Sequence, residues 1–175
     1  MSSKFKLKIV IITIASVVLF LFSCSSAGEK KKLKISSFEI VFEGPLFEGS
    51  NTGQYELKNI LDSFLKANIT SLDKLQSATL TGATISTTDS NYLDIQSLGL
   101  SLASEKSDML QLGILNPMPD NGINMKLNIA KTQEKLIDAI KQPSFFIVID
   151  AITKKDIEAN ISIKCDLEFE IEIKK

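Results

Sequence analysis

The sequence contains no arginine, histidine or tryptophan, and all 20 of its basic residues are lysines. Histidine is the usual general base near neutral pH and the commonest transition-metal ligand. Its absence excludes Ser-His-Asp and Cys-His catalysis and histidine-ligated zinc. Arginine provides bidentate recognition of phosphates and base edges, so its absence disfavours a nucleic-acid partner. We therefore expect a protein that is not an enzyme and that uses no cofactor or metal.

Cysteine is also scarce. The chain has two, Cys24 and Cys165. If Cys24 is modified, no disulfide can form within the chain, and the domain must be stabilised by its hydrophobic core. The part after Cys24 carries 17 of the 20 lysines against 21 acidic side chains, a net charge of about −4, whereas a nucleic-acid binder is normally basic.

Residues 1–23 have the parts of a leader for export. Three lysines precede an apolar run of 14 residues, from Ile9 to Phe22. This run is shorter than the roughly 20 residues that a membrane-spanning helix needs. The segment therefore predicts a signal peptide that is cleaved before Cys24. A plain signal peptide or an uncleaved anchor remains an alternative.

The segment Leu21-Phe22-Ser23-Cys24 resembles the lipobox of bacterial lipoproteins, with leucine at −3, a small residue at −1 and cysteine at +1. In that family the cysteine thiol receives diacylglycerol, the leader is cut, and the new amino group is acylated. The resemblance thus implies lipidation of Cys24 and stable attachment to a membrane. Phe22 departs from the small residue often found at −2. Ser25 at +2 and the lack of acidic residues directly after Cys24 imply an outer-membrane location facing the periplasm.

Residues 24–32 are small and polar, and end in the lysines Lys30, Lys31 and Lys32. This composition predicts a lipidated, flexible tether. Its lysines could rest against anionic head groups, or the segment could be a merely solvated linker.

Alternation of apolar and polar residues dominates the chain from Leu33 to Lys175. In residues 157–173 every odd position is apolar, which predicts a strand with one face in the core. At about 3.3 Å per residue such a strand would run some 56 Å, so we expect a bulge, a bend or a register with two partners. Strands are predicted at 34–43, 76–88, 98–103, 109–114, 125–130, 144–152 and 157–173. The continuous apolar run at 144–152 predicts a central strand covered on both faces.

Two segments, 55–67 and 132–141, have helical periodicity, and a short turn is expected within 90–97. Residues 33–175 are therefore predicted to form one mainly β domain, an antiparallel β-sandwich of about seven strands with two short lateral helices. The order of elements resembles small β-sandwich lipoproteins of unknown function from Bacteroidota. The resemblance rests on the lipobox, the Thr-rich segment LQSATLTGATI and the terminal pair SFFIVIDAI and IEANISIKCDLEFEIEI. It implies an envelope location and a binding or structural role.

Four acidic residues, Asp166, Glu168, Glu170 and Glu172, share one face of the last predicted strand. Carboxylates can bind calcium or a cationic partner. However, successive carboxylates on one strand face lie about 6–7 Å apart and point in parallel. A solvated face that discourages edge-to-edge association is favoured. Cys165 falls on the opposite face and is predicted to be a buried small hydrophobe rather than a nucleophile.

Three loop motifs need an interpretation. The segment Asp89–Asp94 has oxygen donors but lacks the glycine and distal glutamate of an EF-hand, which predicts a capped turn. Asp120-Asn121-Gly122 predicts a tight turn rather than a ligand site. The loop Gly44–Gly49 either exposes Leu46 and Phe47 to a partner or tucks both under the sandwich, and we favour the second.

Together these features predict a membrane-anchored envelope lipoprotein whose sandwich binds a protein or a glycan, or supports an envelope assembly. One alternative is a carrier of an apolar ligand inside the sandwich, suggested by the many Ile, Leu and Phe residues. A less favoured alternative is a carboxylate-based hydrolase, which needs two acids within roughly 5–10 Å across a cleft.

Overall fold

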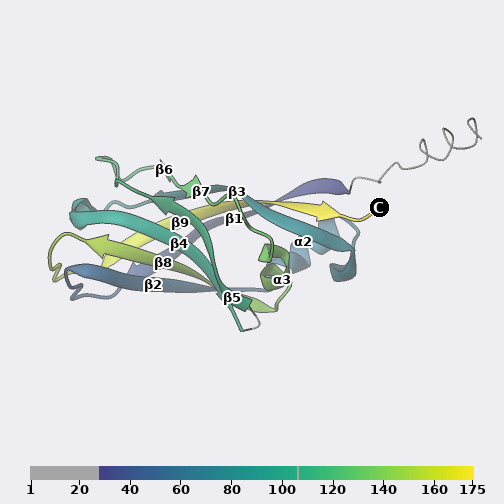
Figure 1. Ribbon diagram of the computed structural model, residues 1–175, viewed down its shortest axis with the longest axis horizontal. Helices are drawn as coiled ribbons and strands as arrows, with labels where there is room; N and C mark the ends of the chain where they lie inside the picture. The colour runs from purple at the N-terminus through teal and green to yellow at the C-terminus, as the bar shows by residue number, and fades with distance from the viewer. Residues whose placement is uncertain (1–27, 106) are drawn as a thin grey trace, which may run out of the picture.

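The computed structural model describes residues 28–105 and 107–175, so Cys24 and the rest of the Leu21–Cys24 motif lie outside the described residues. Two antiparallel sheets form a sandwich, which confirms the predicted mainly β fold (Figure 1). One sheet has the order β1 (Glu29–Phe42), β9 (Ile161–Ile173), β3 (Leu75–Ser86), β6 (Met125–Lys126). The other has the order β2 (Gly49–Lys58), β8 (Ser144–Thr153), β4 (Ile95–Ser104), β5 (Ser107–Leu115), β7 (Asn128–Ile129).

Strand β9 is the centre of the four-stranded sheet. It pairs with β1 on one side and with β3 on the other, which confirms the expectation of two partners. Bulges in both partners accommodate its length, one between Ile35 and Phe38 of β1 and two in β3. All of its odd positions are buried, because the period-two pattern turns every apolar side chain toward the core.

The predicted tether is wrong from Glu29 onward. Glu29 opens β1 opposite Ile173, and residues 30–32 continue the ladder along β9. The sequence pattern predicted a linker here because these residues are charged and precede the first buried apolar side chain, Leu33. Their polar face is instead stabilised by carboxylates of β9, nearly 140 residues away in sequence.

The predicted helix at 55–67 is also partly wrong. Its first residues belong to β2, a strand that the sequence pattern missed, and α2 is confined to Leu61–Ala67. Leu57 is buried from the strand, whereas Leu61 and Phe64 are buried from the helix. Leu57 and Leu61 are four residues apart, a spacing that fits a helix as well as a strand. The end of the strand was therefore counted as the first turn of the helix.

The second predicted helix, 132–141, shortens to α3 (Leu136–Ile140), which is almost wholly buried. The turn expected within 90–97 is the 3-10 helix η2 (Ser90–Asp94), and β4 begins directly after it. A further 3-10 helix, η1 (Leu72–Lys74), leads into β3. No helix in residues 28–105 and 107–175 has the length and apolarity to cross a bilayer.

The strand predicted at 125–130 is divided in two. Its first part, β6, pairs with β3, and its second part, β7, pairs with β5. The segment therefore crosses from one sheet to the other and closes that side of the sandwich. Strand β8 lies between β2 and β4, as expected of a central strand, but its outward face is only partly covered: Val148 is buried and Ile152 is exposed.

Candidate functional site

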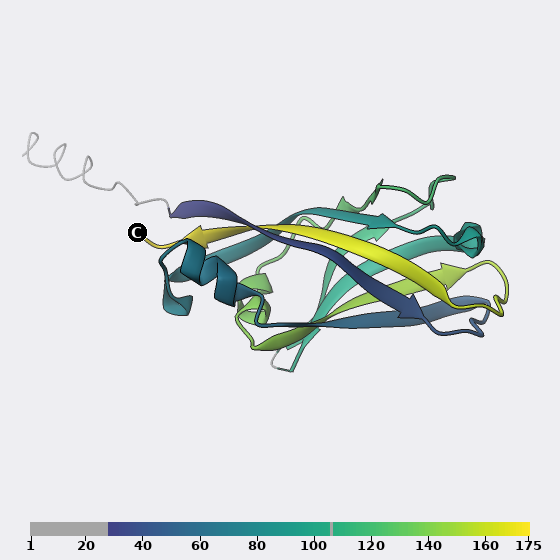
Figure 2. The same cartoon turned by 180° about the vertical axis from the view of Figure 1, so that it is seen from behind.

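The sandwich is elongated, and its two ends differ (Figures 1 and 2). The start of β1 and the C-terminus lie together at one end, where Glu29 pairs with Ile173. The opposite end consists of the β1–β2, β3–β4, β5–β6 and β8–β9 loops. We call this region the loop end and define it as residues 43–48, 87–94, 116–124 and 154–160.

Backbone hydrogen bonds hold the β1–β2 loop to the β8–β9 loop. Leu46 and Ile157 each donate an N–H to the other's carbonyl at 2.8 Å. The Glu48 N–H donates to Asp156 Oδ1 at 2.7 Å, and the Gly44 N–H donates to Asn160 Oδ1 at 2.8 Å. These two loops therefore move little relative to one another, since several bonds would have to break together.

The β3–β4 loop connects the remaining two. The Lys154 N–H donates to the Asp94 carbonyl at 2.7 Å, and Lys155 Nζ lies 3.2 Å from Asp94 Oδ1. On its other side, the Tyr92 hydroxyl donates to the Asp120 carbonyl at 2.5 Å. All four loops are thus joined into one surface, which provides a preorganised binding region of the kind usually built from loops on a rigid scaffold.

The acidic motifs of these loops form turns, as predicted. Asp89 accepts the N–H of Asn91 at 2.9 Å and so caps η2. The carbonyl of Gly122 accepts the Thr87 N–H at 2.7 Å. A side chain at Gly122 would place its Cβ 2.6 Å from the Thr87 carbonyl oxygen, so close approach of two backbones requires glycine there.

The prediction for Leu46 and Phe47 is half wrong. Leu46 is tucked into the core, whereas Phe47 is 65% exposed. Ile123, in the β5–β6 loop, is 64% exposed, and Leu93, in the β3–β4 loop, is 52% exposed. We call Phe47, Leu93 and Ile123 the apolar tip residues. Sequence reasoning missed Leu93 and Ile123; their only signal is a single apolar residue within a polar turn segment.

A cavity of about 430 Å³ lies beside the loop end, on the outer face of the four-stranded sheet. Glu39 and Lys164 lie opposite each other in its floor, one on β1 and the other on β9. The rest of its lining is polar apart from one apolar tip residue; it comprises Ser86, Thr87, Thr88, Asp89, Ser162 and Ile123. This cavity adds hydrogen-bonding groups next to the apolar tip residues.

The acidic row of β9 is occupied by partners within the chain. Lys30 Nζ donates to Glu170 Oε1 and Lys32 Nζ donates to Glu168 Oε1, both at 2.7 Å. The hydrogen bond from Lys32 and its positive charge hold the pKa of Glu168 below its usual value. The same pairs raise the pKa values of Lys30 and Lys32.

The ends of the row are also bonded. Asp166 Oδ1 accepts the N–H of Ser37, in the bulge of β1, at 2.9 Å. Glu172 accepts the Gly28 N–H at 3.2 Å and the Ser77 hydroxyl at 3.0 Å. Within the described residues, no group of three or more carboxylate or thiol side chains is arranged to hold a metal ion. The row therefore stabilises the sheet. The favoured interpretation of a face that discourages edge-to-edge association is wrong, because β9 is not an edge strand but lies between β1 and β3.

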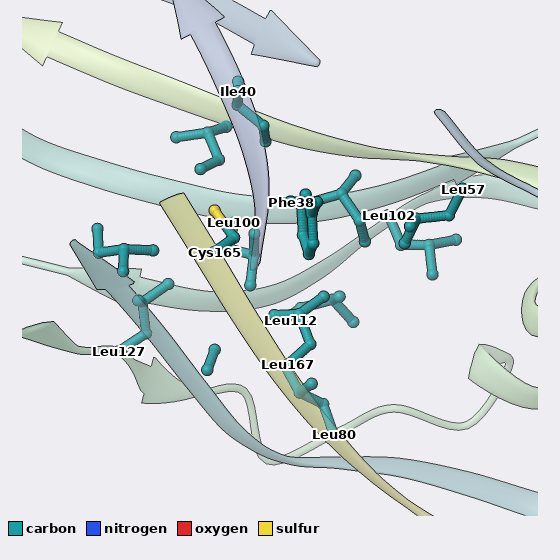
Figure 3. Packing of buried hydrophobic residues seen from close by; sticks show 14 of the residues in the cluster. Phe38, Ile40, Leu57, Leu80, Leu100, Leu102, Leu112, Leu127, Cys165 and Leu167 are labelled. Carbon is teal, nitrogen blue, oxygen red and sulfur yellow. The ribbon is translucent and has the colours of Figure 1, made fainter. Parts of the chain in front are cut away.

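Cys165 is fully buried on the core face of β9. Figure 3 shows it inside the sandwich, among side chains from both sheets that include Phe38 and Leu100. Burial, with a smaller effect from Asp166, raises the pKa of its thiol to about 12. The thiol therefore stays protonated at neutral pH and cannot act as a nucleophile.

Comparison with known proteins adds little to this geometry. The chain matches no protein-family model and no curated protein. Among solved structures, a chain from Desmodium yellow mottle tymovirus is similar over 83% of this chain and 89% of that chain, with 12% sequence identity and a TM-score of 0.30. A likeness at this level carries no argument about function.

Proposed function

We propose that the chain is a lipid-anchored envelope protein that is not an enzyme and whose loop end binds another protein. The anchor is the lipid on Cys24, implied by the resemblance of residues 21–24 to a lipobox. Outer-membrane attachment, with the domain facing the periplasm, follows from the same resemblance.

The observation that carries the binding role is the exposure of the apolar tip residues on one connected surface. Phe47, Leu93 and Ile123 come from three different loops and are all more than half exposed. Exposing large apolar side chains gives up stability that their burial would provide, about 1.5–3 kcal/mol each. Their three loops lie at the end of the sandwich away from the start of β1 (Figure 1), and exposed apolar residues at such a place suit contact with a partner.

The carrier alternative gains less support. The two sheets bring fully buried Phe42, Phe145 and Phe169 together in a shared core. The largest of the four cavities described has a volume of about 530 Å³, but it is open at the surface between β5 and the segment before α3. An apolar ligand would usually need an enclosed, largely apolar pocket.

For the hydrolase alternative, the cavity to consider is the one with the most acids in its lining among the four described for residues 28–105 and 107–175. Glu105, Asp108 and Asp138 surround an open cavity of about 370 Å³, together with Lys135. All three acids are exposed. A glycosidase holds its general acid in an environment that favours the protonated form, usually by removing it from water. We therefore favour the binding role.

The test of partner binding is a crosslinking pull-down from intact envelopes with the lipidated protein. We expect a specific partner that is captured by the wild type and lost when Phe47 and Ile123 are both changed to Ser. Met109→Ser is the matched control, because Met109 is 58% exposed but belongs to β5 rather than the loop end. Equal loss in the control, or retention in the double variant, would contradict the proposal.

The anchor is tested separately by metabolic labelling with an alkyne fatty acid. The wild-type chain should be labelled and should remain with the membrane fraction. Cys24→Ser should be unlabelled and released. An unlabelled wild-type protein would refute lipidation whatever the pull-down shows.

A further inference from the structure

The end of the sandwich opposite the loop end has features of its own. Gly28, the first described residue, adjoins it, and the Lys174 N–H donates to the Lys74 carbonyl at 2.8 Å. The C-terminus is thereby held beside the turn that follows α2. In Figure 2, α2 lies next to the C-terminus and to the start of β1. Any anchor upstream of Gly28 must join the domain at this end.

Helix α2 ends at this location in an unusual turn. The Thr70 N–H donates to the Leu65 carbonyl at 3.1 Å, and the Ile69 N–H donates to the Lys66 carbonyl at 3.3 Å. This pair of bonds defines a Schellman motif, in which the residue at the position of Ile69 adopts a left-handed conformation and is most often glycine. Ile69 has φ of +49°. A β-branched residue is strained at such an angle, and here it fills a glycine position.

Packing within the fold does not compensate for the strain at Ile69. It is 94% exposed, the highest value among the large apolar residues of the described chain. Leu72, in η1 three residues later, is 43% exposed. The backbone strain therefore weakens the free domain and is not offset by burial of the side chain, whereas contact with an apolar medium would provide that burial.

Lysines surround this apolar pair. Lys66 and Lys74 flank it in sequence, and Lys174 and Lys175 end the chain beside Lys74. Within the described residues, none of the four forms an ion pair with a carboxylate. Of the nearby acids, Glu29 is paired with Lys31, whereas Asp62 and Asp73 are exposed and keep their negative charges, Asp73 with a hydrogen bond from Ser71. The four lysines outnumber these two carboxylates, so the exposed charge of this end is net positive.

We infer that this end is a second membrane contact, in which Ile69 and Leu72 enter the head-group region of the bilayer while the four lysines face anionic lipid. The inference rests on the proposed anchoring at Cys24. Each lysine near an anionic surface strengthens attachment about fivefold, and one aliphatic side chain adds a modest further gain. Such contacts are weak alone, but an anchored domain makes them within one molecule at high effective concentration. The contact would fix the orientation of the sandwich, with its loop end directed away from the membrane.

The test places an environment-sensitive fluorophore on the lipidated protein in vesicles that contain phosphatidylglycerol and brominated phosphatidylcholine. The labelled site is Ile69→Cys, with Phe47→Cys as the control at the loop end. Lipid on Cys24 blocks that thiol, and the buried Cys165 thiol does not react. We expect the probe at residue 69 to shift to shorter wavelength and to be quenched by the bromines, while the probe at residue 47 does neither.

Ile69→Gly supplies a second measurement. It should raise the denaturant midpoint of the lipidated protein, because glycine removes the strain at positive φ. It should also increase the rotational mobility of a probe at residue 47 on vesicles. Relief of strain alone would raise the midpoint and leave the mobility on vesicles unchanged, so the mobility is the measurement that reports membrane contact.

The outcomes separate the two proposals. Protein that remains with the vesicles but shows no shift or quenching at residue 69 would overturn the second contact and leave the anchor standing. Protein that does not remain with the vesicles would overturn the anchor and the second contact together. Equal responses at residues 47 and 69 would also overturn the inference, since they would indicate a domain that lies along the membrane.

Discussion

The side chain of Gln133 hydrogen-bonds to the backbone of Leu80 as a neighbouring strand would. Its Oε1 accepts the Leu80 N–H at 2.6 Å, and its Nε2 donates to the Leu80 carbonyl at 3.3 Å. Leu80 lies where β3 extends past the end of its short neighbour β6. An unpaired strand edge invites association with other chains, and one amide side chain satisfies both backbone groups at this point.

Gln133→Ala should lower the free energy of unfolding by about 1–3 kcal/mol, because it leaves a half-buried backbone N–H without an acceptor. Urea unfolding followed by circular dichroism measures the change. Gln54→Ala is the control, since Gln54 is exposed on the edge strand β2. The interpretation fails if both variants lie within about 0.5 kcal/mol of the wild type.

Gly53→Ala should destabilise the domain by about 1–3 kcal/mol through overpacking. Its Cβ would lie 2.7 Å from Ile40 Cγ2 and 3.2 Å from Phe42 Cζ, where β2 crosses close to β1. Gly82→Ala should be neutral or slightly stabilising, because its nearest neighbour would be 3.7 Å away. Equal unfolding free energies for the two variants would show that β1 and β2 can move apart enough at Gly53 to accommodate a methyl group.

Glu168→Gln should weaken the protein at neutral pH and have less effect in acid. The pKa of Glu168 is lowered in the folded state, chiefly by the hydrogen bond from Lys32, so its stabilising effect is present above the unfolded pKa. That effect is lost as pH falls through the folded pKa. Unfolding measured across this range, at low and high salt, should show the difference from wild type shrinking with acid and with salt.

Glu158→Gln is the matched control for that series. Glu158 is exposed in the β8–β9 loop and forms no ion pair among the described residues. Its substitution removes a charge without breaking an ion pair and should change the free energy of unfolding by less than about 0.5 kcal/mol. If the Glu168 variant behaves in the same way, the ion pairs of Glu168 with lysines make no measurable contribution to the free energy of unfolding.

Cys165 should react with a thiol reagent only when the domain unfolds. The pKa of its buried thiol is raised to about 12, so the unfolded thiol ionises first as pH increases. Stability should therefore fall between the unfolded pKa of about 8.5 and the folded value, and Cys165→Ala should remove that part of the pH dependence. Rapid labelling of the native protein at neutral pH would contradict the burial.

Much of the sandwich was predictable from period-two alternation alone, because every strand with a regular core face carries that pattern in its own residues. Strand β2 was not predictable in this way. It is an edge strand with only Gly53 and Leu57 buried, so its sequence shows almost no alternation. Edge strands bury little, and local patterns record burial more strongly than backbone pairing.

The candidate site was less predictable than the fold. Turn chemistry identified two of the loops, but their assembly depends on bonds such as that from Tyr92 to Asp120, which join separate segments. Lys30 and Lys32 presented the same difficulty, since their carboxylate partners Glu170 and Glu168 come from the far end of the chain. No local window contains both members of such a pair.

In the proposed anchoring, the early start of β1 would limit the distance between the domain and a lipid on Cys24. Only residues 25–28 separate Cys24 from Glu29, and a chain of that length extends at most about 18 Å, whatever its conformation. Strand β9 alone, with 13 residues, accounts for about 40 Å of the sandwich. A domain anchored in this way would hold its loop end within a narrow range of heights above the bilayer, and a partner would have to bind there. Lengthening residues 25–28 with a Gly-Ser insert would then raise that range of heights and leave the binding surface unaltered.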